Sequence, residues 1–274
     1  MTADSEKRAV LEALCRLPAA IPDFVNSYEP VNKPFAPDNL DQAVALWRQF
    51  GFLWRRRKSP KYSGSAWSDS WDTPAHGWVT ADLPMKSGQS LATDLVRILC
   101  ERLFADFGMV HLPCQDREQE LMTATNTGGN LVMVASHVLQ RFLPDLYWLT
   151  IFGPPYVDHF GRERLLSVPA FRVEELPYGG IWIQLSESPL DFLEDYDRVN
   201  AVRQRAKEHL DRDSFFNLEY WYAARGVRSI PEYIEKRQDL VIGGTAPPGE
   251  HRYNVPDFRL RERRRELGIR PVRS

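Results

Sequence analysis

The chain has 274 residues, of which 43% are hydrophobic, and its 35 Lys and Arg against 37 Asp and Glu give a formal net charge of −2. This composition excludes disorder along most of the chain, and the charge excludes a uniformly basic nucleic-acid binder. Three cysteines without a short-range pairing pattern favour a reducing compartment, and the sequence shows neither a signal peptide nor a membrane span of about 18 apolar residues. We therefore expect a soluble cytoplasmic protein.

The first third of the chain predicts two amphipathic helices and the beginning of a sheet. Apolar residues recur at helical spacing over residues 5–17 and 39–50. The proline-rich stretch between these helices predicts a connection without regular structure. Aromatic and β-branched runs between residues 52 and 83 predict two antiparallel strands, separated by a loop rich in Ser, Gly and Asp.

The clearest predicted helix covers residues 90–107, with Ser90 as its N-cap and Gly108 as its end. A strand at 109–113 and a helix near 133–143 are predicted to follow it.

The next part of the chain alternates between strands and helices. A dense apolar strand is predicted at 147–153, and the prolines after it predict one or two helical turns. Strands at 170–176 and 180–186 flank a Tyr-Gly-Gly turn and predict a hairpin. Acidic residues early and basic residues late in 190–211 match the helix dipole and predict a helix.

These elements predict an α+β fold, with a mixed, mainly antiparallel sheet and helices packed on one face. A duplicated α/β unit is the alternative, because an aromatic strand followed by a helix occurs more than once. We expect one domain over residues 1–240. Residues 241–274 are expected to form a Gly/Pro linker followed by an arginine-rich tail, residues 257–274.

Sequence motifs for catalysis, cofactors and metals are incomplete. The glycine-rich patterns that hold nucleotide phosphates and the serine elbow of hydrolases do not occur. His111 and Cys114 form half of a zinc motif, but no second pair follows, so packing is the better interpretation. We therefore predict no cofactor, no metal and no small-molecule substrate, and a binding protein rather than an enzyme.

The densest polar cluster surrounds His159. Together with Asp158 and Glu163 it could place an acid/base pair beside cationic side chains. Alternating charges at a helix end broken by glycine more often form exposed ion pairs. A metal-dependent enzyme acting on nucleic acid is therefore the runner-up hypothesis.

Trp67, Trp71 and Trp78 bracket a loop rich in Ser, Asp and Gly. This composition suits rigid anchors in a protein interface, but large aromatic side chains fill sheet faces equally well. The two interpretations stay balanced at this point.

Residues 143–192 resemble the immunity protein 52 family and related type VI secretion immunity proteins of bacterial polymorphic toxin systems. The resemblance is carried by a leucine-proline element, an aromatic strand, spaced glycines, a tyrosine, a proline and a closing strand. In this sequence they are Leu143-Pro144, Tyr147-Trp148, Gly153, Tyr156, Phe160-Gly161, Pro169 and Ile181–Leu185. Gly153, Tyr156, Gly161 and Pro169 are the fold signature that the resemblance implies.

The resemblance implies a cytoplasmic α+β protein that binds and neutralises a cognate toxin encoded nearby, often a nuclease, without chemical turnover. Acidic residues that imitate nucleic acid would suit such an inhibitor. The candidates are Asp191, Glu194, Asp195 and Asp197, together with the three tryptophans above. A third hypothesis is a structural or regulatory component of a bacterial defence or secretion system, in which the arginine-rich tail docks a partner or nucleic acid, and nucleic acid binds through this tail only.

Overall fold

The computed structural model describes residues 4–47, 51–67, 77–114, 117–125, 134, 136–226, 228 and 253–256. The chain divides into two compact units. Unit 1 comprises Met1–Leu112, Leu146–Leu210 and Pro256–Ser274, and unit 2 comprises Pro113–Asp145 and Asp211–Val255. The predicted boundary between residues 240 and 241 lies outside the described residues, as does the arginine-rich tail, so both stay predictions.

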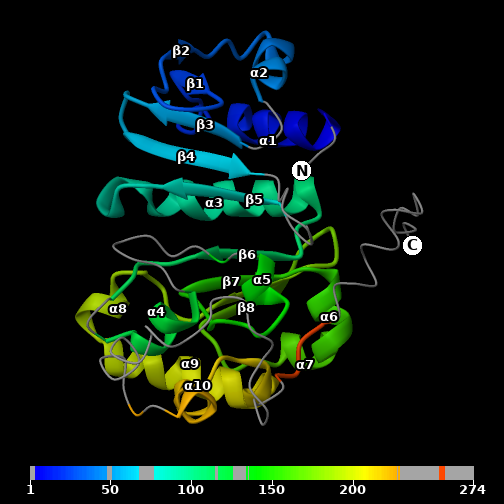
Figure 1. Ribbon diagram of the computed structural model, residues 1–274, viewed down its shortest axis with the longest axis vertical. Coiled ribbons are helices and arrows are strands. Elements are labelled where there is room, and N and C mark those ends of the chain that lie inside the picture. The colour runs from blue at the N-terminus through cyan, green and yellow to red at the C-terminus, as the bar shows by residue number, and fades with distance from the viewer. Residues whose placement is uncertain are drawn as a thin grey trace. The chain divides into compact units, whose positions relative to one another are not determined.

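Unit 1 contains two antiparallel sheets (Figure 1). The first has the strand order β2-β1-β3-β4-β5. Its strands are β1 (Phe24–Asn26), β2 (Lys33–Pro34), β3 (Gly51–Arg56), β4 (Tyr62–Trp67) and β5 (Trp78–Asp82). The second has the order β6-β7-β9-β8. Its strands are β6 (Phe107–Val110), β7 (Leu149–Phe152), β8 (Arg172–Glu175) and β9 (Ile181–Gln184).

The α+β class and the antiparallel pairing are confirmed, although the strands are divided between two sheets. The hairpin predicted around the Tyr-Gly-Gly turn is confirmed as β8 and β9. The two sheets differ in connectivity, because β9 lies between β7 and β8 whereas β3, β4 and β5 follow one another in chain order. The second sheet therefore does not repeat the strand order of the first.

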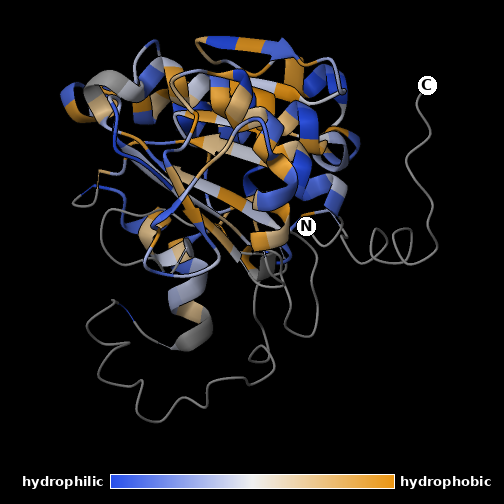
Figure 2. Cartoon of the chain, turned by 90° about the horizontal axis from the view of Figure 1, so that it is seen from above, coloured by the Kyte–Doolittle hydropathy of each residue, from blue (hydrophilic) through white to orange (hydrophobic). Residues whose placement is uncertain are grey.

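The core of the first sheet is formed with helices α1 (Asp4–Arg16), α2 (Leu40–Leu46) and α3 (Met85–Leu103). Their apolar stripes pack against the aromatic side chains of β3; the members include Val10, Leu11, Leu14, Ala43, Phe52, Trp54, Leu91 and Leu95. The helices in Figure 2 carry hydrophobic and hydrophilic residues along the same length, as amphipathic helices do. The helix predicted at 5–17 is confirmed.

The remaining helices of unit 1 are two pairs, one between β7 and β8 in the chain and one after β9. They are α6 (Pro154–Phe160), α7 (Arg162–Leu166), α8 (Asp191–Glu194) and α9 (Tyr196–Leu210). Helix α6 contacts β7, and α7 contacts both β8 and α9. None of the helices within the described residues combines the length and apolar character that a membrane span requires.

The proline-rich stretch was predicted to lack regular structure, and this is wrong. Strand β1 lies inside the first sheet, between β2 and β3, and its Val25 is buried. The physical reason is that prolines 22 and 30 lie outside this short strand, so each of its residues keeps the backbone N–H that pairing needs.

Part of the stretch interpreted as a Ser/Gly/Asp-rich loop is strand β4, which pairs with β3 on one side and β5 on the other. Tyr62 and Ala66 of β4 are buried. Glycine is required at position 64, because a Cβ atom there would overlap the indole of Trp54 on the neighbouring strand. The glycine that resembled a loop signal thus lets a large core side chain lie across the strand.

Helix α3 differs from its prediction at both ends. It begins after Pro84 rather than at Ser90, and it ends at Leu103, where Phe104 takes the left-handed conformation with φ 50°. Gly108 does not end the helix. It lies in β6, where a Cβ atom would come within 2.5 Å of the Cys100 sulfur, so close packing between α3 and β6 explains this glycine.

Unit 2 contains α4 (Gln119–Thr125), α5 (Ser136–Leu139), a 3₁₀ turn η1 (Arg212–Ser214) and α10 (Leu218–Arg225). Its apolar cluster is formed by Ala124, Val138, Phe142 and Phe216, with Val134, Leu218, Trp221 and Tyr253 packed against it. A parallel bridge between Leu143 and Phe215 joins its two main segments. The Leu143 amide donates to Ser214 O at 2.9 Å, and the Phe216 amide donates to Leu143 O at 2.8 Å.

Candidate functional site

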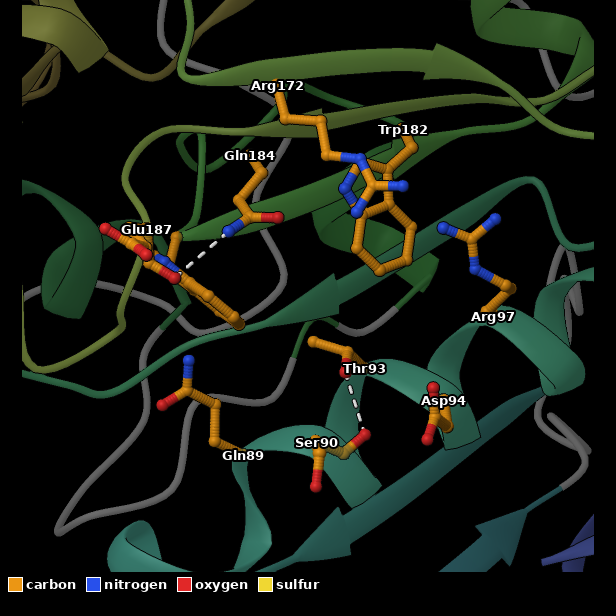
Figure 3. A pocket seen from close by; sticks show the side chains of 10 residues that line it. Gln89, Ser90, Thr93, Asp94, Arg97, Arg172, Trp182, Gln184 and Glu187 are labelled. Atoms are coloured by element: carbon orange, nitrogen blue, oxygen red, sulfur yellow. Dashed lines mark hydrogen bonds between the residues drawn. The ribbon is translucent and has the colours of Figure 1, made fainter.

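A polar pocket of about 510 Å³ lies in unit 1, between α3 and one face of the β8–β9 hairpin (Figure 3). Its lining from α3 is Gln89, Ser90, Thr93, Asp94 and Arg97. Its lining from the second sheet and the loop after β9 is Trp148, Arg172, Trp182, Gln184 and Glu187. The size lies within the range of pockets that hold small ligands or partner side chains.

The periodicities of the two elements place these side chains together. Leu91 and Leu95 of α3 enter the core of the first sheet, so the polar positions between them face away from that core. On the hairpin, Arg172 pairs with Gln184 and residue 174 pairs with Trp182. Because cross-strand partners and alternate residues share a sheet face, these four side chains lie on one side.

Glu174 ties the two arginines of the pocket together. One of its carboxylate oxygens forms an ion pair with Arg97 and the other with Arg172. Burial raises the pKa of Glu174, but hydrogen bonds from both guanidinium groups outweigh this effect and hold the pKa below its usual value. The Arg97 guanidinium also stacks on the Trp182 ring, 4.5 Å from the ring centroid. Both arginine side chains are therefore engaged within the protein.

A pH-dependent contribution to stability follows from the lowered pKa of Glu174. The stabilisation is complete above the pKa of an unfolded glutamate, about 4.3, and is lost as the pH falls through the lower folded value. Glu174→Gln should reduce the free energy of unfolding at pH 7 by about 1 kcal/mol and flatten the dependence of melting temperature on pH below pH 5. Thermal unfolding at several pH values measures both. The exposed Glu208→Gln provides the control, and an unchanged pH profile for Glu174→Gln contradicts the prediction.

The loop after β9 is fixed by buried polar groups. The Gln184 Nε2 amide donates to Ser186 O at 2.8 Å and to Glu187 O at 3.2 Å. The Trp148 indole N–H donates to the same Ser186 carbonyl at 3.0 Å. Gln184 is only 7% exposed, so its side chain is held in one orientation at the pocket wall.

The predicted acidic residues lie on α8, at its C-cap Asp195 and in the first turn of α9. Phe192 is buried beneath α8, where its ring lies 5.0 Å from His111 and 6.1 Å from Tyr196. Arg198 neutralises part of this cluster. Its Nε lies 2.7 Å from an oxygen of Asp195 and its Nη2 lies 3.5 Å from one of Asp191.

No family model matches the chain, and no curated protein matches it. Among solved structures, a T6SS protein of Pseudomonas aeruginosa is similar with 13% sequence identity and a TM-score of 0.42, over 87% of this chain and 85% of that chain. A similarity at this level carries no argument about function. Membership of the immunity protein 52 family therefore stays a hypothesis.

The four residues of the implied fold signature lie along α6, α7 and the approach to β8. Gly153 is the N-cap of α6, and a Cβ atom there would overlap the carbonyl oxygen of Ala105. Tyr156 is buried, with its ring 5.3 Å from that of Phe152. Gly161 joins α6 to α7 with φ 87°, and Pro169 is exposed before β8. Gly153, Tyr156 and Gly161 thus each have a structural explanation.

Trp67 and Trp78 form a cross-strand pair at the end of the β4–β5 ladder. Trp67 also packs on β3, because a Cβ atom at Gly51 would come within 2.6 Å of its ring. Trp71 lies outside the described residues. Sheet packing thus explains the two described tryptophans, and a role for them in toxin binding stays a prediction.

The structure separates the residues of the runner-up enzyme hypothesis between two helices. Asp158 and His159 lie on α6, whereas Glu163 lies on α7 and forms an ion pair with Arg162 at 2.8 Å. His111 accepts a hydrogen bond from the Trp148 amide through Nδ1 at 3.2 Å. Within the described residues, no three His, Cys, Asp or Glu side chains gather closely enough to hold a metal ion.

Proposed function

We propose that this protein is an immunity protein that binds a cognate toxin, a nuclease effector, and neutralises it by covering its active site without chemical turnover. The proposal is supported by the residue pattern of 143–192 and by the surface of α8. The observation that carries it is Leu193, a leucine that is 50% exposed on a turn of helix rich in carboxylates.

The exposure of Leu193 follows from its neighbour. Because Phe192 is anchored in the core, the next residue of so short a helix must point outward. Glu194 and Asp195 follow Leu193 directly and are exposed. An apolar side chain surrounded by charged groups resembles the centre and rim of a protein interface.

The charge of this surface suits a nuclease as partner. A nuclease active site that holds a phosphate backbone is positively charged, so a carboxylate cluster is attracted to it and accelerates association. Arg198 already compensates Asp191 and Asp195. Glu194 has no ion pair within the described residues, which makes it the most effective single position for such attraction.

The proposal is tested with the toxin encoded beside this protein's reading frame. Glu194→Lys combined with Asp197→Lys should lower the association rate about tenfold at low salt, with a smaller effect at high salt. Leu193→Ala should instead raise the dissociation rate, because it removes an apolar contact. Binding kinetics on a toxin-coated surface measure both rates, and rescue of toxin-expressing cells measures the consequence.

Glu208→Lys is the control, because Glu208 is an exposed acid farther along α9, and its reversal changes the charge by as much as either single reversal in the double variant. Circular dichroism checks that each variant is folded. Association and dissociation rates that match the wild type in both α8 variants would place the interface elsewhere. A toxin that does not bind the wild-type protein would reject the proposed function itself.

A further inference from the structure

We propose that the pocket between α3 and the β8–β9 hairpin binds a cationic group, a guanidinium or an ammonium, carried on an apolar stem. The inference concerns a different surface from α8 and does not depend on the proposed function. It rests on the hydrogen-bonding groups that the pocket leaves unused.

The first observation is the carbonyl oxygen of Gln184. Its side chain is nine-tenths buried, and its amide nitrogen is committed to the carbonyls of Ser186 and Glu187. Rotating the amide would place its oxygen against those two carbonyl oxygens, so the orientation is fixed. Figure 3 shows the oxygen on the opposite side, toward Trp182 in the pocket. The hydrogen bonds from the Gln184 side chain to Ser186 and Glu187 both use its amide nitrogen, so the oxygen is an acceptor that a ligand in the pocket can reach.

The second observation is the balance of charge around the pocket. Asp94 and Glu187 line the pocket, and neither carboxylate has an ion pair within the described residues. The two arginines share Glu174 as their partner. Two arginines and three carboxylates leave one excess negative charge, which favours a cation.

An anionic ligand is the alternative that two arginines would suggest. To reach them it would have to displace Glu174, which is partly buried and would lose both partners. A cation instead meets free acceptors and requires no existing ion pair to break. Trp148 and Trp182 border the pocket and offer a narrow apolar edge for the stem of the ligand, because both residues are almost completely buried.

Agmatine, which carries a guanidinium and an ammonium on a four-carbon stem, is the probe for this site. Isothermal titration calorimetry should show binding of agmatine and none of 1,4-butanediol, which lacks the charges. Glutarate tests the anionic alternative. Binding of glutarate without binding of agmatine, or binding of neither, would overturn the proposal.

Three variants test the assignment to this pocket. Gln184→Met removes the carbonyl acceptor at the pocket wall and should weaken agmatine binding about tenfold. Asp94→Asn combined with Glu187→Gln changes only rim side chains and should weaken it about fivefold. Glu208→Gln, an exposed acid outside the pocket, should leave the affinity unchanged. Unchanged affinity in the rim double variant overturns the assignment, and this result does not depend on whether Gln184→Met folds.

The same titration distinguishes a free amine from a side chain of a partner protein. N-acetyl-arginine amide presents the guanidinium and its stem as a protein does, without a second cation. Affinity equal to that of agmatine supports a partner's arginine as the natural occupant. Affinity about tenfold weaker supports a free diamine-like ligand, whose second charge is then recognised as well.

Discussion

Replacing Gly153 with alanine is expected to lower the melting temperature by about 10 °C or to prevent folding. The new Cβ atom would overlap the carbonyl oxygen of Ala105 and crowd the backbone of Asp106. The Gly153 amide donates to Asp106 O at 2.9 Å, so the two segments are held together and neither can withdraw without losing this bond. An overlap with backbone, which cannot move aside as a side chain can, costs about 3 kcal/mol, which is a large part of the stability of an ordinary domain.

Gly226→Ala is the matched control for this substitution. Gly226 ends α10 with φ 60°, and no atom lies within 4 Å of the position where its Cβ would be. Alanine there meets only the left-handed backbone penalty, about 1 kcal/mol. Thermal unfolding of both variants measures the difference. If Gly153→Ala is as stable as Gly226→Ala, the close approach between Gly153 and Ala105 is not a constraint of the fold.

The elements that the sequence predicted best are those whose burial follows one strong periodicity. Helix α1 was predicted within one residue at each end, because Val10, Leu11 and Leu14 all face the same core. The β8–β9 hairpin was predicted because its turn has a local signature, and Gly179 indeed takes φ 85° there. Local rules suffice where the local pattern and the tertiary contacts agree.

The first sheet was predicted less well, because contacts with neighbouring strands, rather than local sequence patterns, determine which of its residues form strands. Strand β4 has serines, a glycine and an alanine where β-branched residues were sought. Its position between two other strands, and the passage of Trp54 across Gly64, make it a strand. No pattern within β4 alone encodes the neighbour that needs this glycine.

The pocket was not predicted for a similar reason. Its two walls are separated by about eighty residues in the chain, and each is the polar side of an amphipathic element. Taken singly, Asp94 on α3 or Arg172 on β8 is typical of a solvated surface. The available signal was the charged alternation of β8, which places Arg172 and Glu174 on one face, but it does not reveal which helix lies opposite.

A pair of truncations is expected to separate the arginine-rich tail from the fold of unit 2. Removing residues 257–274 should lower the melting temperature by less than about 2 °C, because a segment so rich in charge contributes little apolar burial. Removing residues 251–274 also deletes Tyr253. The Tyr253 ring lies 5.0 Å from that of Phe142 and stacks with Phe216 at 6.5 Å, and Asn254 donates to Asp213 O at 3.1 Å.

Loss of these contacts should cost about 2–3 kcal/mol, or roughly 5–10 °C in melting temperature, through the cavity left beside Phe142 and Phe216. Tyr253→Ala in the full chain should reproduce most of this loss, which distinguishes the aromatic anchor from the length of the tail.

Tyr253→Phe is the conservative variant and should retain the ring contacts while losing the 3.2 Å hydrogen bond from the Asn217 amide to the Tyr253 hydroxyl. Because this bond is partly exposed, the phenylalanine variant should unfold within about 3 °C of the wild type. Equal melting temperatures for the two truncations would show that Tyr253 does not anchor unit 2. A large loss already on removing residues 257–274 would show that the tail belongs to the folded structure.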